Sequence, residues 1–304
     1  THIKISPKPE VKATIDYLLI NAAECEPYLT PDVREILEDS ENIVEGMKMV
    51  AKLLDVKNAV IGIEDNKPEA IKLMTERLAQ VKIDGINFKV ETLPSRYPQG
   101  AEKVLIDQCT GRQVPPGKLP SDVGCVVMNV TSIAVLANYV ATGMPLTTKR
   151  LTVDGSAISE PKNVRVPIGT PIKDIVEFCG GYKGTPFKII SGGPMMGMAL
   201  STIDIPVVKT SSALTCFMED EVEKYEESAC IRCGKCAQVC PSHVIPQKLM
   251  EAAQHYDMER FTALNGMECC ECGCCTFICP AKRPLTQAFK QMRQAVAAER
   301  RKKK

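Results

Sequence analysis

Positive and negative charges nearly cancel in this chain of 304 residues, with 38 Lys and Arg against 37 Asp and Glu. Such a balance creates no overall field that would attract nucleic acid, so we expect no nucleic-acid partner. Lys4, Lys8 and Lys12 lie among polar residues in the first segment, so no secretion signal is expected there. The longest uncharged stretch, 123–148, contains Asn129, Thr131 and Pro145 and predicts a buried strand and helix rather than a membrane span.

Cysteine, in contrast, is abundant: the chain has 15, and ten of them fall between Cys230 and Cys279. A disulfide framework is typical of small secreted domains, which this chain does not resemble in length. The crowding therefore predicts bound metal in a reducing compartment. Five cysteines stand alone and are expected to be buried free thiols: Cys25, Cys109, Cys125, Cys179 and Cys216. Because of its neighbours in the sequence, a functional role is left open for Cys25.

Two cysteine runs share the spacing C-x2-C-x2-C-x3-C-P, which is typical of [4Fe–4S] ferredoxins. The first consists of Cys230, Cys233, Cys236 and Cys240, and the second of Cys269, Cys272, Cys275 and Cys279. In two-cluster ferredoxins the fourth cysteine of each run binds the other cluster. We therefore expect Cys279 to complete the first cluster and Cys240 the second.

Structural zinc is the alternative, because C-x-x-C pairs also bind Zn²⁺. Zinc sites use two separated pairs and do not need a doubled four-cysteine run, so iron–sulfur is favoured. Cys270 and Cys274 do not fit the spacing and are interpreted as free thiols beside the second cluster. His243 and His255 lie near the runs, but each cluster already has four thiols, so surface or packing roles are expected.

The order of predicted elements divides the chain into parts. Alternating strands and helices predict an α/β domain over residues 1–146. Short strands between Gly, Pro and Asn turns predict a small β domain over 147–200. A connector is expected over 201–227, an all-helical domain with the clusters over 228–296, and a solvated basic tail over 297–304.

The sequence combines the cysteine module with the segments 21–29 (NAAECEPYL), 97–102 (YPQGAE) and 191–197 (SGGPMMG). Together these four segments resemble the RnfC family. Its members are the C subunits of the Rnf complex, the membrane-bound, ion-pumping ferredoxin:NAD⁺ oxidoreductase of bacteria. That family is similar to the NADH-binding flavoprotein subunit of respiratory complex I. The resemblance implies an α/β domain for FMN and NADH, a β-grasp domain of the soluble-ligand-binding type, and a helical domain with two [4Fe–4S] clusters.

The same resemblance implies roles for residues of the first domain. Asn21 and Asn129 are expected to hydrogen-bond FMN. Glu24, Glu26, Tyr97 and Glu102 are expected to line the nicotinamide pocket and to serve catalysis. At Ala23 and Ala101 the chain departs from the complex I pattern, so contacts made there by acids are not carried over.

The family's glycine-rich loop for the FMN phosphate precedes the T-H-x-K segment with which this sequence begins. Backbone N–H groups of such loops hold most of the phosphate, so these residues by themselves are expected to bind FMN weakly. The resemblance also implies that other Rnf subunits are the partners, including membrane and iron–sulfur subunits, and that ferredoxin is reached through them. It further implies that the protein lies peripherally on the cytoplasmic face of the membrane. The alternatives are a cobalamin reductase or an amino-acid-reductase electron carrier of the same lineage, or an electron-wire subunit that binds no nucleotide.

Overall fold

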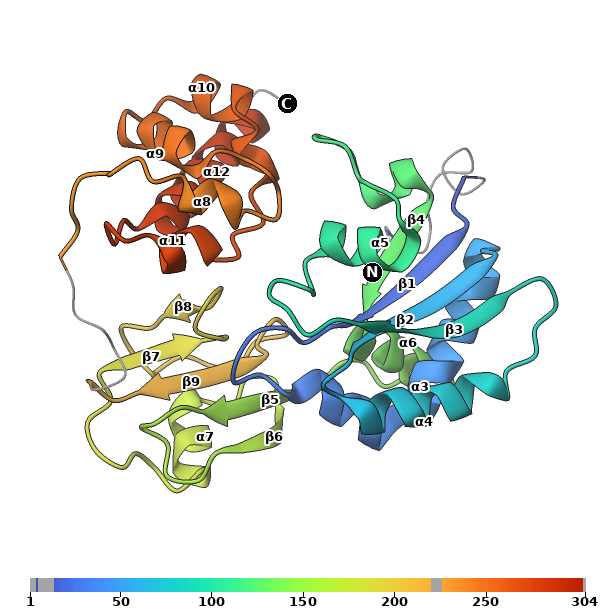
Figure 1. Cartoon of the computed structure of the whole chain (residues 1–304). Helices are drawn as coiled ribbons and strands as arrows, with labels where there is room; N and C mark the ends of the chain where they lie inside the picture. The colour runs from blue at the N-terminus through green and yellow to red at the C-terminus, as the bar shows by residue number, and fades with distance from the viewer. Residues whose placement is uncertain (1–3, 5–13, 220–225, 303–304) are drawn as a thin grey trace. The chain divides into compact units, whose positions relative to one another are not determined.

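The computed structural model describes Lys4 and residues 14–219 and 226–302, which fall into two compact units, Thr1–Val222 and Glu223–Lys304 (Figure 1). The first unit begins with a parallel sheet in the order β3-β2-β1-β4. Its strands are β1 (Tyr17–Ala22), β2 (Asn58–Glu64), β3 (Asn87–Leu93) and β4 (Cys125–Asn129). The helices between and after them are α3 (Pro31–Leu54), α4 (Pro68–Ala79), α5 (Glu102–Thr110), the short η1 (Pro120–Val123) and α6 (Val130–Thr142).

Both faces of this sheet are covered, because successive side chains of a strand point to opposite faces. Leu18 and Ile20 of β1 pack into a large core with α3, α4 and α6, whereas Leu19 packs into a smaller core with α5. Figure 1 shows α3, α4 and α6 below the sheet and α5 above it. Residues 18–20 of β1 and 59–64 of β2 are buried without a break, as a parallel sheet with helices on both faces requires.

Helix α3 is a single helix with a kink, where the sequence predicts two helices that meet at Ser40. Pro31 occupies the first turn, as its fixed φ favours. Asp39 has non-helical dihedral angles, and its carboxylate accepts a hydrogen bond from the Asn42 side chain at 2.8 Å. The predicted interruption is therefore present, but the chain continues through it to Leu54.

The second half of the first unit is a five-stranded mixed sheet in the order β6-β5-β9-β7-β8, packed on α7 (Ile172–Phe178). Its strands are β5 (Thr148–Asp154), β6 (Lys162–Pro167), β7 (Lys188–Ser191), β8 (Met198–Ala199) and β9 (Ala213–Phe217). Strand β9 is fully buried and lies between β5 and β7. The prediction of a connector over 201–227 is therefore wrong at β9, whose central place follows from pairing with strands far away in the sequence.

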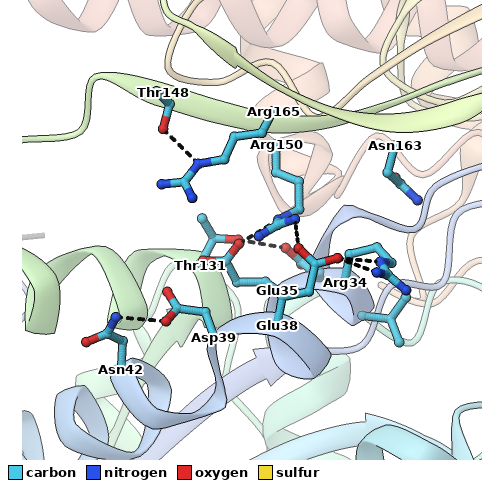
Figure 2. A network of polar contacts seen from close by, with 12 residues as sticks. Arg34, Glu35, Glu38, Asp39, Asn42, Thr131, Thr148, Arg150, Asn163 and Arg165 are labelled. Carbon is cyan, nitrogen blue, oxygen red and sulfur yellow. Dashed lines mark hydrogen bonds and ion pairs between the residues drawn. The ribbon is translucent and has the colours of Figure 1, made fainter.

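Arg150 on β5 links this domain to α3. Its guanidinium reaches the carboxylates of Glu35, at 2.9 Å, and Glu38, which also pairs with Arg34 (Figure 2). Glu35 is only 7% exposed, and burial raises its pKa while the bond from Arg150 opposes that rise. A buried carboxylate needs such a partner, so the ion pair fixes Arg150 against this turn of α3.

The second unit is helical over its described residues. Its elements are α8 (Lys235–Gln238), α9 (Pro246–Gln254), α10 (Met258–Ala263), η3 (Gly266–Glu268), α11 (Cys274–Ile278) and α12 (Leu285–Lys302). Phe261 and Phe289 are fully buried in its core. The tail predicted over 297–304 is instead helical to Lys302, and residues 303–304 lie outside the described residues. A helix is compatible with this sequence because basic residues in a last helical turn complement the helix dipole. No described helix has both the length and the hydropathy for a membrane span.

Candidate functional site

The carboxyl edge of the parallel sheet brings the two predicted flavin residues, Asn21 and Asn129, together. The chain leaves β1 for β2 on one side and later returns to pair β4 on the other, so a topological switch point lies between β1 and β4. In open α/β sheets ligands bind outside the carboxyl ends of strands at such a point. Asn21 and Asn129 are directly paired there in the strand register.

Both asparagines have protein partners in the structure. The Asn21 side chain donates to the Gly100 carbonyl at 2.9 Å and accepts from the Ala23 N–H at 3.1 Å. The Asn129 side-chain oxygen accepts from the Thr131 N–H at 2.9 Å and so caps α6. These bonds fix the orientation of both amides, and among the described residues one N–H of each amide has no hydrogen-bond partner.

Glu24 lies at the N-terminus of α3 rather than in solution. Its carboxylate accepts from the backbone N–H groups of Asp32, at 2.8 Å, and Val33, at 3.3 Å. Burial, and next the nearby Asp32 carboxylate, raise the pKa of Glu24 to about 7. Glu24 is therefore a carboxyl group that can hold or release a proton near neutral pH, the property required of a general acid or base.

Asp32 is a site residue that the sequence reasoning did not select. Its two carboxylate oxygens accept from the Asn129 amide at 2.8 Å and the Thr131 hydroxyl at 3.1 Å. Burial raises its pKa, and these two hydrogen bonds oppose the rise. Asp32 thus joins the first turn of α3 to the end of β4, a contact between distant segments that no local pattern reveals.

The loop before α5 crosses the same edge of the sheet. Its Tyr97–Pro98 peptide bond is cis. Gln99 is fully buried, and among the described residues its side-chain nitrogen has no hydrogen-bond partner; a bound group or water commonly satisfies such an atom. The Gly100 N–H donates to the Cys25 thiol at 3.2 Å, and burial raises the pKa of that thiol.

Two of the predicted nicotinamide residues make ionic or polar contacts of their own. Glu102 opens α5 and pairs with Lys4 at 2.8 Å, and both side chains are about half exposed. Glu26 instead turns toward the β-grasp domain, where its carboxylate accepts from the Met195 and Met196 N–H groups. Glu24 therefore lies at the N-terminus of α3 and Glu102 at the start of α5, whereas Glu26 is engaged with the β-grasp domain.

The helical unit contains a cavity of about 330 Å³ lined by Cys230, Cys233, Cys236 and Cys279. Three of these come from the first cysteine run and the fourth from the second, as the crossed arrangement predicts. Burial raises the pKa of Cys236, and the Cys279 thiol lies close enough to raise it further. Four thiols around one cavity form the donor set of a [4Fe–4S] cubane.

The other four thiols are more deeply placed. Cys272 and Cys275 are buried, and the Cys275 sulfur lies 3.6 Å from the Thr286 hydroxyl at the start of α12. The pKa of Cys275 is raised chiefly by burial, with a further contribution from Cys240. Cys240 therefore lies near the second run, although it directly follows the first in sequence.

Two cysteines and two histidines near the runs are not expected to be cluster ligands, and their surroundings differ. The pKa of Cys270 is raised by its contact with Cys272 and by burial, and Cys274 also contacts Cys272. His243 and His255 are exposed. Among the described residues no three His, Cys, Asp or Glu side chains form a group suited to a single metal ion.

Three family models match successive parts of the chain: the Nuo51 FMN-binding domain over residues 1–138, the SLBB domain over 150–199 and the 4Fe-4S binding domain over 223–245. The C subunit of the Na(+)-translocating ferredoxin:NAD(+) oxidoreductase complex of Acetobacterium woodii is 41% identical over 302 residues, which are 99% of this chain and 67% of that protein. The chain belongs to this family, the RnfC proteins. The predicted family membership and fold class are confirmed.

Other relatives support the same membership in the RnfC family. The corresponding subunit of the proton-translocating complex of Clostridium ljungdahlii is 48% identical over 248 residues, covering 82% of this chain and 53% of that protein. The C subunit of the ion-translocating oxidoreductase complex of Rhodobacter capsulatus is 39% identical over 293 residues, or 96% and 56%. The chain thus spans 53% to 67% of the length of these relatives.

Among solved structures, the NAD+-reducing [NiFe]-hydrogenase in its air-oxidized state matches with a TM-score of 0.61 and 18% identity, over 93% of this chain and 56% of the hydrogenase chain. The H2-reduced state matches with a TM-score of 0.58 over 94% and 57%. At this identity the match concerns the fold, and it agrees with an α/β domain, an SLBB domain and a helical iron–sulfur unit in that order.

Proposed function

We propose that this protein is the electron-transfer subunit of a membrane-bound, ion-translocating ferredoxin:NAD⁺ oxidoreductase, with electrons passing between NAD(H), FMN and two [4Fe–4S] clusters. The observation that carries the proposal is the cavity lined by thiols of both cysteine runs. The relatives' names supply the reaction and the complex. The partners are the other Rnf subunits, including membrane and iron–sulfur subunits, and ferredoxin is reached through these partners. The protein itself lies peripherally on the cytoplasmic face of the membrane.

Cys230, Cys233, Cys236 and Cys279 would hold one cluster, and Cys269, Cys272, Cys275 and Cys240 the other. Cys230 and Cys233 are exposed, whereas Cys272 and Cys275 are buried. The first cluster would consequently be the one that a partner can approach, and the second would be shielded by the helical core. Shielding matters because solvent exposure is one of the factors that set a cluster's reduction potential.

For the nucleotides, Asn21 and Asn129 would orient FMN at the switch point, and Glu24, Tyr97 and Glu102 would line the nicotinamide pocket. When bound, FMN exchanges two electrons with NAD(H) and single electrons with a cluster. The residues fit this use, because the asparagine amides are held rigidly and Gln99 has a buried nitrogen without a partner among the described residues. Glu24 can hold a proton at its carboxylate near neutral pH.

The test is the metal and flavin content of the protein purified without oxygen. Two cubanes require about eight irons per chain, with four inorganic sulfides for each cluster. Stoichiometric zinc with negligible iron would refute the cluster proposal. Full iron with no FMN in the intact subunit would instead support an electron wire that binds no nucleotide.

A further inference from the structure

The segment Glu26–Thr30, between β1 and α3, is attached to the β-grasp domain at every second residue. The first attachment is Glu26, whose oxygen Oε1 accepts from the Met195 N–H at 2.8 Å and from the Met196 N–H at 2.7 Å. Hydrogen bonds to an ionised acceptor are about twice as strong as neutral ones. One carboxylate oxygen thus holds two consecutive backbone groups of the turn that precedes β8.

That turn is shaped to receive Glu26. A Cβ atom at Gly193 would lie 2.5 Å from the Glu26 carboxyl carbon, so only glycine lets the carboxylate approach. The turn is closed by its own bond from the Gly197 N–H to the Gly193 carbonyl at 2.9 Å. The contact therefore depends on one residue from each domain.

Tyr28 and Thr30 provide the next two attachments. The Tyr28 ring meets Phe217 of β9 edge to face, with centroids 5.3 Å apart. The Thr30 N–H donates to the Thr152 hydroxyl of β5 at 3.0 Å, and the Asn163 side chain of β6 donates to the Thr30 hydroxyl at 2.8 Å. Thr152 is only 4% exposed, so this contact lies inside the packed structure.

The residues just before this segment contact the carboxyl edge of the parallel sheet. Glu24 binds the N-terminus of α3, and the Cys25 thiol accepts from Gly100. One further link, from Arg150 to Glu35 and Glu38, fixes the following helix to β5 (Figure 2). The segment and the start of α3 are therefore held between the two domains.

We propose that the β-grasp domain is a brace that sets the position of the β1–α3 segment, and that Glu26 is the positioning residue of this brace rather than a group that touches nicotinamide. The part of this inference that concerns cofactor affinity depends on the proposed function. The brace itself does not, since the contacts are made by the protein alone.

The decisive comparison is Glu26→Ala with Glu26→Gln in the full chain. Both N–H groups donate to one oxygen, so the glutamine oxygen can still accept them, whereas alanine cannot. Hydrogen–deuterium exchange is measured on peptides that cover 23–30 and 191–199. Glu26→Ala should speed exchange in both by roughly tenfold or more, the effect of losing charge-assisted hydrogen bonds, and Glu26→Gln by much less.

Glu160→Ala is the matched control, because Glu160 is an exposed carboxylate of the β-grasp domain that pairs with Lys162. It should leave exchange in both peptides unchanged. Gly193→Ala tests the brace from the other domain and should speed exchange in 23–30. If Glu26→Ala and Gly193→Ala both leave the 23–30 peptide as in the wild type, the brace is refuted.

The NADH kinetics of the FMN-loaded protein separate the two roles of Glu26. A positioning role predicts that Glu26→Gln keeps the wild-type KM for NADH. A nicotinamide contact through the charge predicts that Glu26→Gln raises KM as much as Glu26→Ala, and that result, with exchange unchanged, would overturn the proposal. Failure of the intact subunit to bind FMN would refute the flavin part of the proposed function and leave the exchange result standing.

Discussion

Replacement of Glu24 by glutamine should reduce the loss of stability that the α/β domain shows between pH 5 and pH 8. The pKa of Glu24 is raised from 4.5 to about 7, chiefly by burial. A carboxyl group with a raised pKa binds its proton more tightly in the folded than in the unfolded state. Its stabilising effect is therefore fully present below pH 4.5 and is lost as the pH rises toward 7.

The size of the effect follows from the two pKa values. A difference between 4.5 and about 7 corresponds to about 3 kcal/mol of lost stability above pH 7, of which about 2.5 kcal/mol is lost between pH 5 and pH 8. Glutamine stays neutral throughout and lacks this loss. The free energy of unfolding of Glu24→Gln, relative to wild type, should consequently increase by about 2.5 kcal/mol between pH 5 and pH 8.

Urea denaturation followed by circular dichroism at the two pH values measures this difference. Thr75→Ala is the control, because its hydroxyl bonds the Ile71 carbonyl on the exposed face of α4 and the change adds no titrating group. Its effect on stability should be the same at both pH values. A constant difference between Glu24→Gln and wild type would show that Glu24 titrates alike in both states and would refute the reasoning.

Three further changes test other parts of the structure. Cys240→Ala should alter the EPR signal of the cluster bound by the second run, in the way expected of Cys272→Ala; a spectrum like that of Cys233→Ala would contradict the crossed ligation. Gly100→Ala should destabilise the protein by about 1–3 kcal/mol in a urea titration, because its Cβ would collide with the Ala23 carbonyl, and wild-type stability would count against so close a packing. Glu102→Ala in the FMN-loaded protein should lower kcat/KM for NADH by roughly ten- to a hundredfold with iron content unchanged, while unaltered kinetics would make Glu102 a surface residue.

Much of the α/β domain was predictable because its signals are local. The apolar runs of β1 and β2, Pro31 in the first turn of α3, and the strand Cys125–Asn129 are all visible in short windows of sequence. Strand β9 was missed because a buried five-residue segment looks like a connector until its partners β5 and β7 are known. The helical end of α12 was missed because a run of basic residues indicates solvent exposure, and an exposed segment can still be helical.

The candidate site divides in the same way. The spacing of the eight cysteines by itself predicts which residues bind iron, since three thiols at two-residue intervals can surround one corner of a cubane. Only the folded helical unit gathers Cys279 with the first run in one cavity and brings Cys240 near Cys275.

At the sheet edge, only the tertiary structure decided which groups surround each carboxylate. It joined Asp32 to Asn129, buried Glu24 at a helix end, and turned Glu26 toward another domain. The physical reason is that a side chain's partners and its exposure to water depend on segments distant in sequence, whereas backbone preference and ligand spacing depend on the nearest residues alone.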